Sequence, residues 1–381
     1  SNTLYYYNYS QKKEGLNFTS DTQNYIKMKL EGYFIEEEPT KSIFDNLPFI
    51  SSKKGTQLKS WTDKIYDISN DPEIDGLIIE LGNVEAGFSK RRTIFQTLMR
   101  MKENGKKIIV YTQNDISNMN YHLISMADEI YTHRMSSVLL RGLTMEPMFI
   151  RGLLDTISIV PEVIRVSPYK TAADMLLNRK MSDEMKENYS ELLEDLYEIM
   201  VNDISTARGW DNEKTKLTID NGPYLSSIKA IESELIDGVM FPDEFGKYIN
   251  KINDKNIEFI DWDEYNNNDF YVNDWKTDKK SKIAVIYAVG GIVSGESNPG
   301  AGGSTMMGDK TIIKAIKDAR EDKDIKAIIL RVDSGGGSAL ASDMMWKEVY
   351  NTTVQDSLNI KPFIVSMSDV AASGGYYISC Q

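Results

Sequence analysis

The sequence contains few of the residues on which several kinds of catalytic site depend. Its 381 residues include one cysteine, Cys380, and two histidines, His122 and His133. A single cysteine excludes an intrachain disulfide and any metal site with several thiolate ligands. Because both histidines lie in the first half, a histidine-based site within the second half alone is excluded. The carboxylates form no paired cluster typical of metal sites, so we expect no metal and no cofactor.

The chain also lacks long apolar runs and an excess of basic residues. The longest apolar candidate, residues 283–293, falls short of the ~20 residues that span a bilayer and contains Gly290 and Gly291. Acidic residues outnumber basic ones by 57 to 44, which gives a formal net charge of −13. Since nucleic-acid-binding proteins present clustered Lys and Arg, we expect no nucleic-acid partner.

The chain contains an internal repeat. Residues 72–81 (PEIDGLIIEL) resemble residues 323–332 (KDIKAIILRV). A second apolar run follows each copy, at residues 107–111 and 362–366. Runs of β-branched residues and Leu are typical of buried parallel strands, and helix-like segments lie between them. This alternation predicts right-handed crossover units, and therefore an α/β fold of two tandem repeats.

The repeat divides the chain into four parts. We assign residues 1–70 to an N-terminal extension with the opening strands of the first repeat, 71–262 to the first repeat, 263–281 to a linker and 282–381 to the second repeat. Apolar residues at helical spacing predict a helical insertion at 180–210. Because the chain stops at Gln381, directly after a well-formed motif, we expect the second repeat to be truncated at its C-terminus and the chain alone to be inactive.

Two segments of the second repeat have the composition of catalytic loops. Residues 333–338 (DSGGGS) follow a buried strand, and their glycines let backbone N–H groups face an anion. A tight turn with positive φ explains the same glycines. Residues 371–376 (AASGGY) place Ser373 among small residues at a sharp turn, as an exposed nucleophile requires. Close packing of a helix on a strand explains this segment equally well.

Lys170, in the segment SPYKTA at residues 167–172, is a candidate general base. A lone lysine is normally a solvated surface charge, so its candidacy depends on the shortage of other bases for Ser373. Lysine has a reference pKa of ~10.4. It acts as a base only after removal from water lowers that value toward neutrality. Ser167 and Lys170 also match the S-x-x-K pattern of penicillin-binding enzymes, but the S-D-N and K-T-G partner motifs are absent.

Together these motifs resemble the long, two-repeat signal peptide peptidases of the protease IV (SppA) type. That family consists of Ser–Lys dyad serine proteases in the Clp-protease/crotonase-like superfamily. Its serine lies in an A-S-G-G-Y motif, matched by residues 372–376, and its lysine in a Y-K-S-A-like motif, matched by residues 169–172 with Thr171 in place of Ser. Its glycine loop usually reads S-P-G-G-S, where this sequence has Gly335 in place of Pro. The resemblance runs from about residue 70 to the last residue.

The resemblance implies a serine endopeptidase that works through an acyl-enzyme. Ser373 would be the nucleophile and Lys170 the general base, and the backbone N–H groups of Gly374 and Gly336 would form the oxyanion hole. The implied substrates are hydrophobic peptides, remnant signal peptides in particular, cut at the outer, periplasmic face of the bacterial cytoplasmic (inner) membrane. A homo-oligomer is also implied, as is an N-terminal membrane anchor that is absent from this chain.

The two repeats differ at the expected site. Asn118 takes the place of Ser373, and residues 84–86 (VEA) replace the three glycines at 335–337. We therefore expect one composite site, with the lysine from the first repeat and the serine from the second. Two alternatives remain open: a crotonase-like acyl-thioester enzyme that uses the same glycine loops, and a non-catalytic scaffold.

Overall fold

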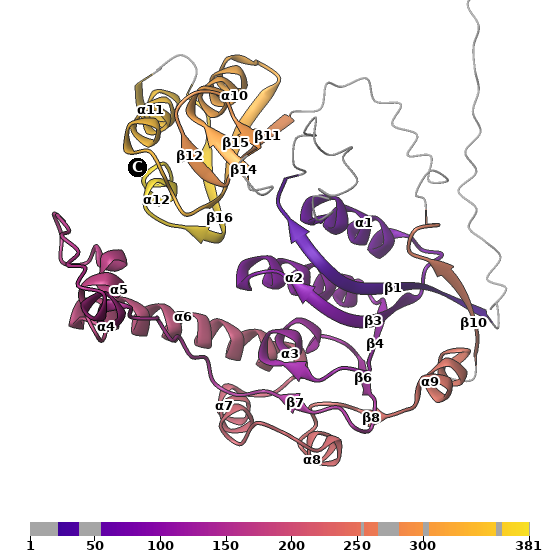
Figure 1. The fold of residues 1–381 in the computed structure, drawn as a ribbon. Coiled ribbons are helices and arrows are strands. Elements are labelled where there is room, and N and C mark those ends of the chain that lie inside the picture. Colours follow the sequence, from indigo (N-terminus) through magenta and orange to yellow (C-terminus); the bar gives the residue numbers. More distant parts are fainter. Residues whose placement is uncertain are drawn as a thin grey trace, which may run out of the picture.

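The computed structural model describes residues 22–37, 55–252, 255–265, 282–299, 305–355 and 360–380. These residues form two α/β units, each with a parallel sheet on which helices pack (Figure 1). The predicted fold class is confirmed. Most of the predicted linker, residues 263–281, lies outside the described residues, as do residues 1–21 and 38–54 of the predicted extension.

The larger sheet has the strand order β8-β6-β4-β3-β1-β10-β9, with β2 paired to β1. Its strands are β1 (Thr22–Ile35), β2 (Thr56–Gln57), β3 (Gly76–Glu85), β4 (Lys107–Thr112), β6 (Glu129–Thr132), β8 (Gly238–Val239), β9 (Lys251–Ile252) and β10 (Lys255–Asp261). Neighbouring strands are parallel, except that β9 and β10 are antiparallel. A separate ribbon pairs β5 (Ile116–Ser117) with β7 (Val138–Leu139).

The central strand β3 is a continuous apolar run because both faces of this sheet are covered. The covering helices are α1 (Leu58–Asn70), α2 (Phe88–Glu103), α3 (Asn118–Ile124) and α9 (Pro242–Ile249). Leu77 and Ile79 lie in the core that contains residues of α1 and α2. Ile78, on the opposite face, lies in a second core with Phe245 of α9. Burial on both faces is what a parallel sheet with crossover helices requires.

Among the described residues, helices cover only one face of the smaller sheet. It has the order β11-β15-β16, all parallel. This unit comprises β11 (Lys282–Val289), β12 (Gly291–Val293), β13 (Asn298–Pro299), β14 (Thr305–Gly308), α10 (Asp309–Glu321), β15 (Ile325–Ser334), α11 (Ala339–Tyr350), the π-helical turn η5 (Asn351–Gln355), β16 (Phe363–Ala371) and α12 (Gly374–Tyr377). Ile328 and Leu330 are buried in a core with residues of α10 and α11, whereas Ile283 and Ile364 on the opposite face are exposed.

The same order of elements occurs in both units. The series β1-α1-β3-α2-β4-α3 corresponds to β11-α10-β15-α11-β16-α12, and β3 and β15 are each the central strand of three. The two apolar runs that indicated a repeat, residues 72–81 and 323–332, therefore lie largely on equivalent strands. Asn118 and Ser373 lie at the start of the equivalent helices α3 and α12.

A helical insertion extends from the first unit. It comprises α4 (Arg151–Thr156), the 3₁₀ turn η2 (Thr171–Ala173), α5 (Asp174–Leu177), α6 (Asp183–Arg208), α7 (Asn212–Asp220) and α8 (Ser227–Glu232). The long helix α6 begins at Ser182, whose side chain accepts a hydrogen bond from Met185 N, and ends at Gly209 with a φ of 67°. Met200 and Ile204, near its C-terminal end, are buried in the main core. Its other end supports α4 and α5 away from the first sheet (Figure 1).

The one-sided cover of the smaller sheet can be tested with two isoleucines on neighbouring strands. Ile328 is fully buried, and Ile364 on the other face is 57% exposed. In the 381-residue chain, Ile328→Ala should lower the free energy of unfolding by about 2–5 kcal/mol, because it removes packed methyl groups. The matched control, Ile364→Ala, should stay within about 0.5 kcal/mol of the parent. Urea unfolding measures both; equal losses would contradict the one-sided core.

Candidate active site

Ser373 lies at the turn between β16 and α12. Its φ of 50° and ψ of −119° form a conformation that residues other than glycine rarely adopt. Such a sharp, strained strand-to-helix turn exposes the nucleophile in hydrolases with a nucleophile elbow. The residue is exposed, and its side chain makes no capping hydrogen bond to the helix. Its Oγ is therefore accessible to a substrate.

The glycine loop packs directly against this turn. A Cβ atom added to Gly336 would lie 2.5 Å from Gly374 N and 2.8 Å from Ser373 Cβ. Gly336 also has a φ of 91°, which any other residue would adopt only with strain. The structure thus brings together Ser373 and the two glycines predicted to surround it.

The backbone N–H groups beside the serine differ in their availability. Gly336 N–H donates to Ser334 Oγ at 3.1 Å, and the Ser334 hydroxyl donates in turn to Gly290 O at 2.6 Å. Within the described part of the chain, the N–H groups of Gly337 and Gly374 donate to no protein acceptor. The predicted oxyanion donor Gly374 is therefore free, whereas the other predicted donor, Gly336, is engaged. Gly337, which the sequence did not single out, is a free donor on the same loop.

In the first repeat, an arginine side chain fills the space that corresponds to the one between the glycine loop and the serine turn. The guanidinium of Arg91 donates to Asn120 Oδ1 at 2.7 Å, to Ala86 O at 2.9 Å and to Val84 O. These acceptors lie on α3, at the end of β3 and directly after it, in the segment 84–86 that corresponds to the three glycines. Arg91 is 8% exposed. Its side chain therefore occupies the space between loop and helix, and the first repeat offers no oxyanion site there.

Lys170 lies outside this constellation. It directly precedes η2, its backbone N–H donates to Ser167 O at 3.1 Å, and its side chain is exposed. No ion pair or hydrogen bond of its Nζ is formed with the part of the chain that the structure describes, and none joins it to Ser373. Figure 1 shows the elements α4 and α5, between which Lys170 lies, apart from α12. Within one chain, the structure does not bring the predicted base to the predicted nucleophile.

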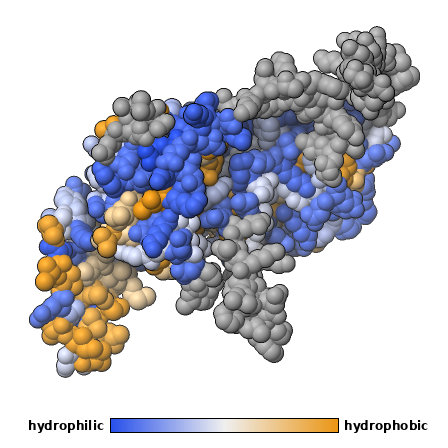
Figure 2. Space-filling view, turned by 90° about the horizontal axis from the view of Figure 1, so that it is seen from above, coloured by the Kyte–Doolittle hydropathy of each residue, from blue (hydrophilic) through white to orange (hydrophobic). Residues whose placement is uncertain are grey.

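The segment around Lys170, residues 144–182, presents an unusual amount of apolar surface; we call it the arm. Ile164 and Val166 are fully exposed, at 101% and 103%. Other exposed apolar side chains of the arm are Met148, Leu153, Ile157, Ile159, Val160, Val163, Met175, Leu176 and Met181. Figure 2 shows apolar residues gathered at the corresponding end of the molecule. Contiguous apolar patches on a protein surface mark contact sites.

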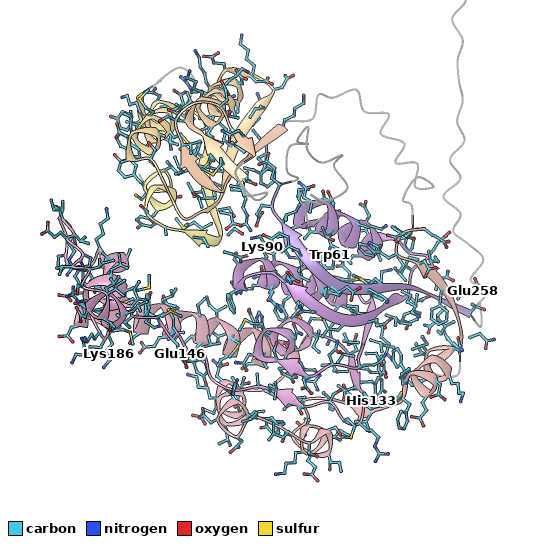
Figure 3. All side chains as sticks on the ribbon, in the orientation of Figure 1. Trp61, Lys90, His133, Glu146, Lys186 and Glu258 are labelled. Carbon is cyan, nitrogen blue, oxygen red and sulfur yellow. The ribbon has the colours of Figure 1, made fainter. Side chains whose placement is uncertain are left out.

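A buried ion cluster joins the two units beside the serine turn. Lys90 Nζ on α2 donates to Asp333 Oδ2 at 2.6 Å and to Asp369 Oδ2 at 2.7 Å; Lys90 is labelled in Figure 3. Burial alone would lower the pKa of Lys90, but the hydrogen bonds with the two aspartates outweigh burial and raise it. Sequence reasoning missed Lys90, because no local pattern indicates partners 243 and 279 positions away.

A second polar contact joins the units nearby. The guanidinium of Arg331 on β15 donates from Nη2 to Glu36 Oε1 at 2.8 Å and from Nε to Glu36 Oε2 at 3.1 Å. Ser368 on β16 also donates to Glu36. Bidentate pairing of this kind fixes orientation as well as distance.

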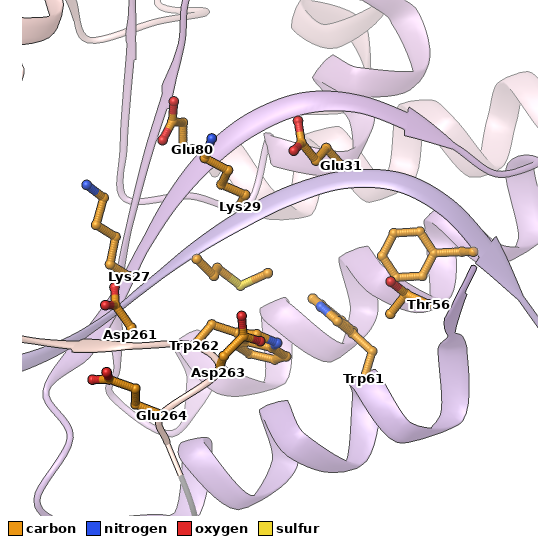
Figure 4. A pocket seen from close by; sticks show the side chains of 12 residues that line it. Lys27, Lys29, Glu31, Thr56, Trp61, Glu80, Asp261, Trp262, Asp263 and Glu264 are labelled. Atoms are coloured by element: carbon orange, nitrogen blue, oxygen red, sulfur yellow. The ribbon is translucent and has the colours of Figure 1, made fainter. Parts of the chain in front are cut away.

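A hollow of about 730 Å³ lies elsewhere, on the first unit. Figure 4 shows Lys27 and Lys29 of β1, Trp61 of α1 and the segment 261–264 around it. Its lining includes neither the serine turn, the glycine loop nor Lys170.

The chain is similar to several known proteases. Residues 100–254, which include Lys170, match peptidase family S49. The chain is 31% identical over 332 residues to the chloroplastic serine protease SPPA of Arabidopsis thaliana, an alignment that covers 85% of this chain and 47% of that protein. It is 29% identical over 377 residues to Protease 4 of Haemophilus influenzae, covering 93% of this chain and 58% of that protein. Protease 4 of Salmonella typhi is 29% identical over 334 residues, covering 83% and 50%.

The fold and these similarities define an α/β chain of the Clp-protease/crotonase-like class. Within that class the chain is related to the SppA-type proteases of peptidase family S49, and the resemblance predicted from the motifs is confirmed. The chain spans about half the length of the curated relatives it matches.

Two further features are absent from the residues that the structure describes. No helix among them is both long and apolar enough to cross a membrane. No group of three or more His, Cys, Asp or Glu side chains among them is arranged to hold a metal ion.

The contact between the glycine loop and the serine turn can be tested with two neighbouring glycines. Gly336→Ala places a methyl group against Gly374 N, whereas a Cβ on Gly335 meets nothing within 4 Å. Loss of an oxyanion donor costs about 10²–10³ in rate, so Gly336→Ala should slow the labelling of Ser373 by a fluorophosphonate to that extent. Gly335→Ala, the matched control, should label at the parent rate. Equal labelling of the two variants in the full-length gene product would contradict the proposed contact.

Proposed function

We propose that the full-length protein is a serine endopeptidase that uses a Ser373–Lys170 dyad. The observation that supports this most directly is the strained, exposed turn at Ser373, which packs against a glycine loop with free N–H groups beside it. The similarity to serine proteases of the SppA type points to the same chemistry.

The reaction follows from the groups at the site. Lys170, in its neutral form, takes the proton of Ser373 Oγ as the oxygen attacks a peptide carbonyl. The N–H of Gly374 stabilises the oxyanion, together with a glycine-loop donor: Gly337, or Gly336 once it has left Ser334 Oγ. Each such donor is worth about 3 kcal/mol in comparable sites. Lys170 then protonates the leaving amine, and water hydrolyses the acyl-enzyme.

The lysine must reach the serine from another copy of the chain. In the single chain Lys170 is solvated and apart from α12, whereas a lysine acts as a base only when it is withdrawn from water. The arm that bears it also exposes an apolar surface that a second copy can cover. We therefore assign the dyad to a homo-oligomer in which the arm of one copy lies against the serine turn of its neighbour.

The substrates proposed are hydrophobic peptides, remnant signal peptides in particular. The proposal rests on the resemblance to the signal peptide peptidases and on the apolar surface of the arm that bears the base. From the resemblance we also place the protein at the bacterial cytoplasmic membrane, with its catalytic part on the periplasmic face and an N-terminal anchor in the full-length form. The net charge of −13 argues against a nucleic-acid partner.

The dyad predicts a defined pH dependence in the full-length gene product. Hydrolysis of a hydrophobic peptide should rise with pH, because the base must lose its proton before attack. Ser373→Ala and Lys170→Ala should each reduce kcat by several orders of magnitude, while Lys180→Ala, a nearby control on the arm, should not. Unchanged hydrolysis in both dyad variants would refute the assignment, and acyl-CoA binding without phosphonate labelling would favour a crotonase-like enzyme.

A dyad shared between copies predicts complementation. Ser373→Ala and Lys170→Ala proteins should each be inactive alone. When they are dissociated, mixed in equal amounts and reassembled, about a quarter of the sites should combine an intact serine with an intact lysine, since partners are drawn at random. Peptide hydrolysis should recover to that fraction. Mixing Ser373→Ala with the double variant should recover nothing, and absence of rescue in the first mixture would place both residues in one chain.

A further inference from the structure

One side chain of the first unit contacts both strands, β15 and β16, that lead into the serine site. Lys90 binds Asp333, which directly precedes Ser334 and the glycine loop, and Asp369, which lies four residues before Ser373. Its side chain is 8% exposed, and those of both aspartates are 15% exposed. Ion pairs this deeply buried are stable only when their geometry and hydrogen bonds are good.

The cluster lies where the sheet itself gives least support. Val332 on β15 pairs with Met367 on β16, but the next pair is Ser334 with Ala371. The step is two residues on β15 and four on β16, so β16 bulges between these pairs. Asp369 lies in this bulge. The regular ladder of hydrogen bonds therefore does not fix residues 368–370, which lie between the pair at Met367 and the pair at Ala371 beside the serine turn.

The contacts of the two aspartates replace the missing ladder. Asp333 Oδ1 accepts a hydrogen bond from Val370 N at 3.1 Å, which ties the bulge to β15. Asp369 accepts from the backbone N–H groups of Gly87 at 2.9 Å and Lys90 at 3.1 Å, at the start of α2. A Cβ on Gly87 would collide with the Asp369 carboxylate, so the start of α2 is fitted closely to the bulge.

We propose that Lys90 is a positioning residue that holds the glycine loop and the serine turn in register from the first repeat. It touches neither substrate nor Ser373 and acts through Asp333 and Asp369. Without its charge, two buried carboxylates would face each other unneutralised, and the two loops would separate. This inference rests on the proposed function, and it gives the repeat without a nucleophile a second task besides supplying Lys170.

The test compares four variants of the full-length gene product. Lys90→Met removes the charge at similar length, and Lys90→Arg keeps it. Asp369→Asn weakens the same cluster but keeps an acceptor for the start of α2. The matched control is Arg92→Met on the same helix. Arg92 pairs with Asp203 inside the first unit, at 2.8 Å, and forms no ion pair with the described residues of the second unit.

The first readout is kinetic. Lys90→Met should reduce kcat and the rate of fluorophosphonate labelling by about 10- to 100-fold, with KM within about twofold, because misplacement of reacting groups by about 1 Å has this effect. Lys90→Arg should recover most of the rate, and Asp369→Asn should lose part of it. Arg92→Met should keep the parent kcat even if it melts at a lower temperature. If Lys90→Met and Asp369→Asn, measured per folded molecule, both keep the parent kcat, the proposal is wrong.

The second readout does not need activity. Amide hydrogen exchange at residues 334–337 and 370–375 should become faster in Lys90→Met than in Arg92→Met. Faster exchange in a protein that hydrolyses no peptide would uphold the positioning role and refute the proposed function. Parent-like exchange in an active enzyme would refute the positioning role and uphold the proposed function. If Lys90→Met does not fold, Asp369→Asn and Lys90→Arg give the same comparison.

Discussion

The close approach of two backbone segments governs the candidate site. Gly336 lies so near the serine turn that a single methyl group on it would collide with Gly374 N and Ser373 Cβ. Three hydrogen bonds maintain this approach. Ser334 Oγ accepts from Gly336 N–H, Ala372 N–H donates to Ser334 O, and Gly336 O accepts from Ile292 N–H. An oxyanion hole of backbone amides needs such proximity, because N–H groups serve only where no side chain intervenes.

The two repeats have diverged by changing what lies at this contact. In the second, glycines leave a space that a substrate oxygen can enter. In the first, Arg91 fills the equivalent space and binds both sides of it. The same arrangement of strands and helices therefore gives an open site in one copy and a closed, hydrogen-bonded core in the other. The roles proposed for the first copy lie away from this space, with Lys90 at the interface between the units and Lys170 on the arm.

Much of the fold could be predicted, because buried strands and helices have recognisable local patterns of apolar residues. The strand β3 is an apolar run because helices bury both of its faces, and alternate residues of β15 are buried by α10 and α11. The helix α6 begins at Ser182, whose side chain has the capping chemistry that helix starts favour. The serine turn and the glycine loop were recognisable by composition. The hydrogen bond of Gly336 to Ser334 was not, because it depends on a loop conformation that three glycines leave open. The ion pairs of Lys90 could not be predicted for another reason: contacts between distant segments produce no periodic pattern in the sequence.

The backbone conformation at Ser373 distributes strain unequally between the two repeats. A non-glycine residue held in a sparsely populated conformation costs of order 1–3 kcal/mol. Asn118, at the equivalent place, belongs to the first turn of a helix and is not among the described residues with positive φ. The strained backbone therefore occurs in the copy that bears the proposed nucleophile, and the equivalent turn of the other copy is unstrained. A substitution that relieved this strain would be expected to stabilise the second unit and to displace the proposed nucleophile.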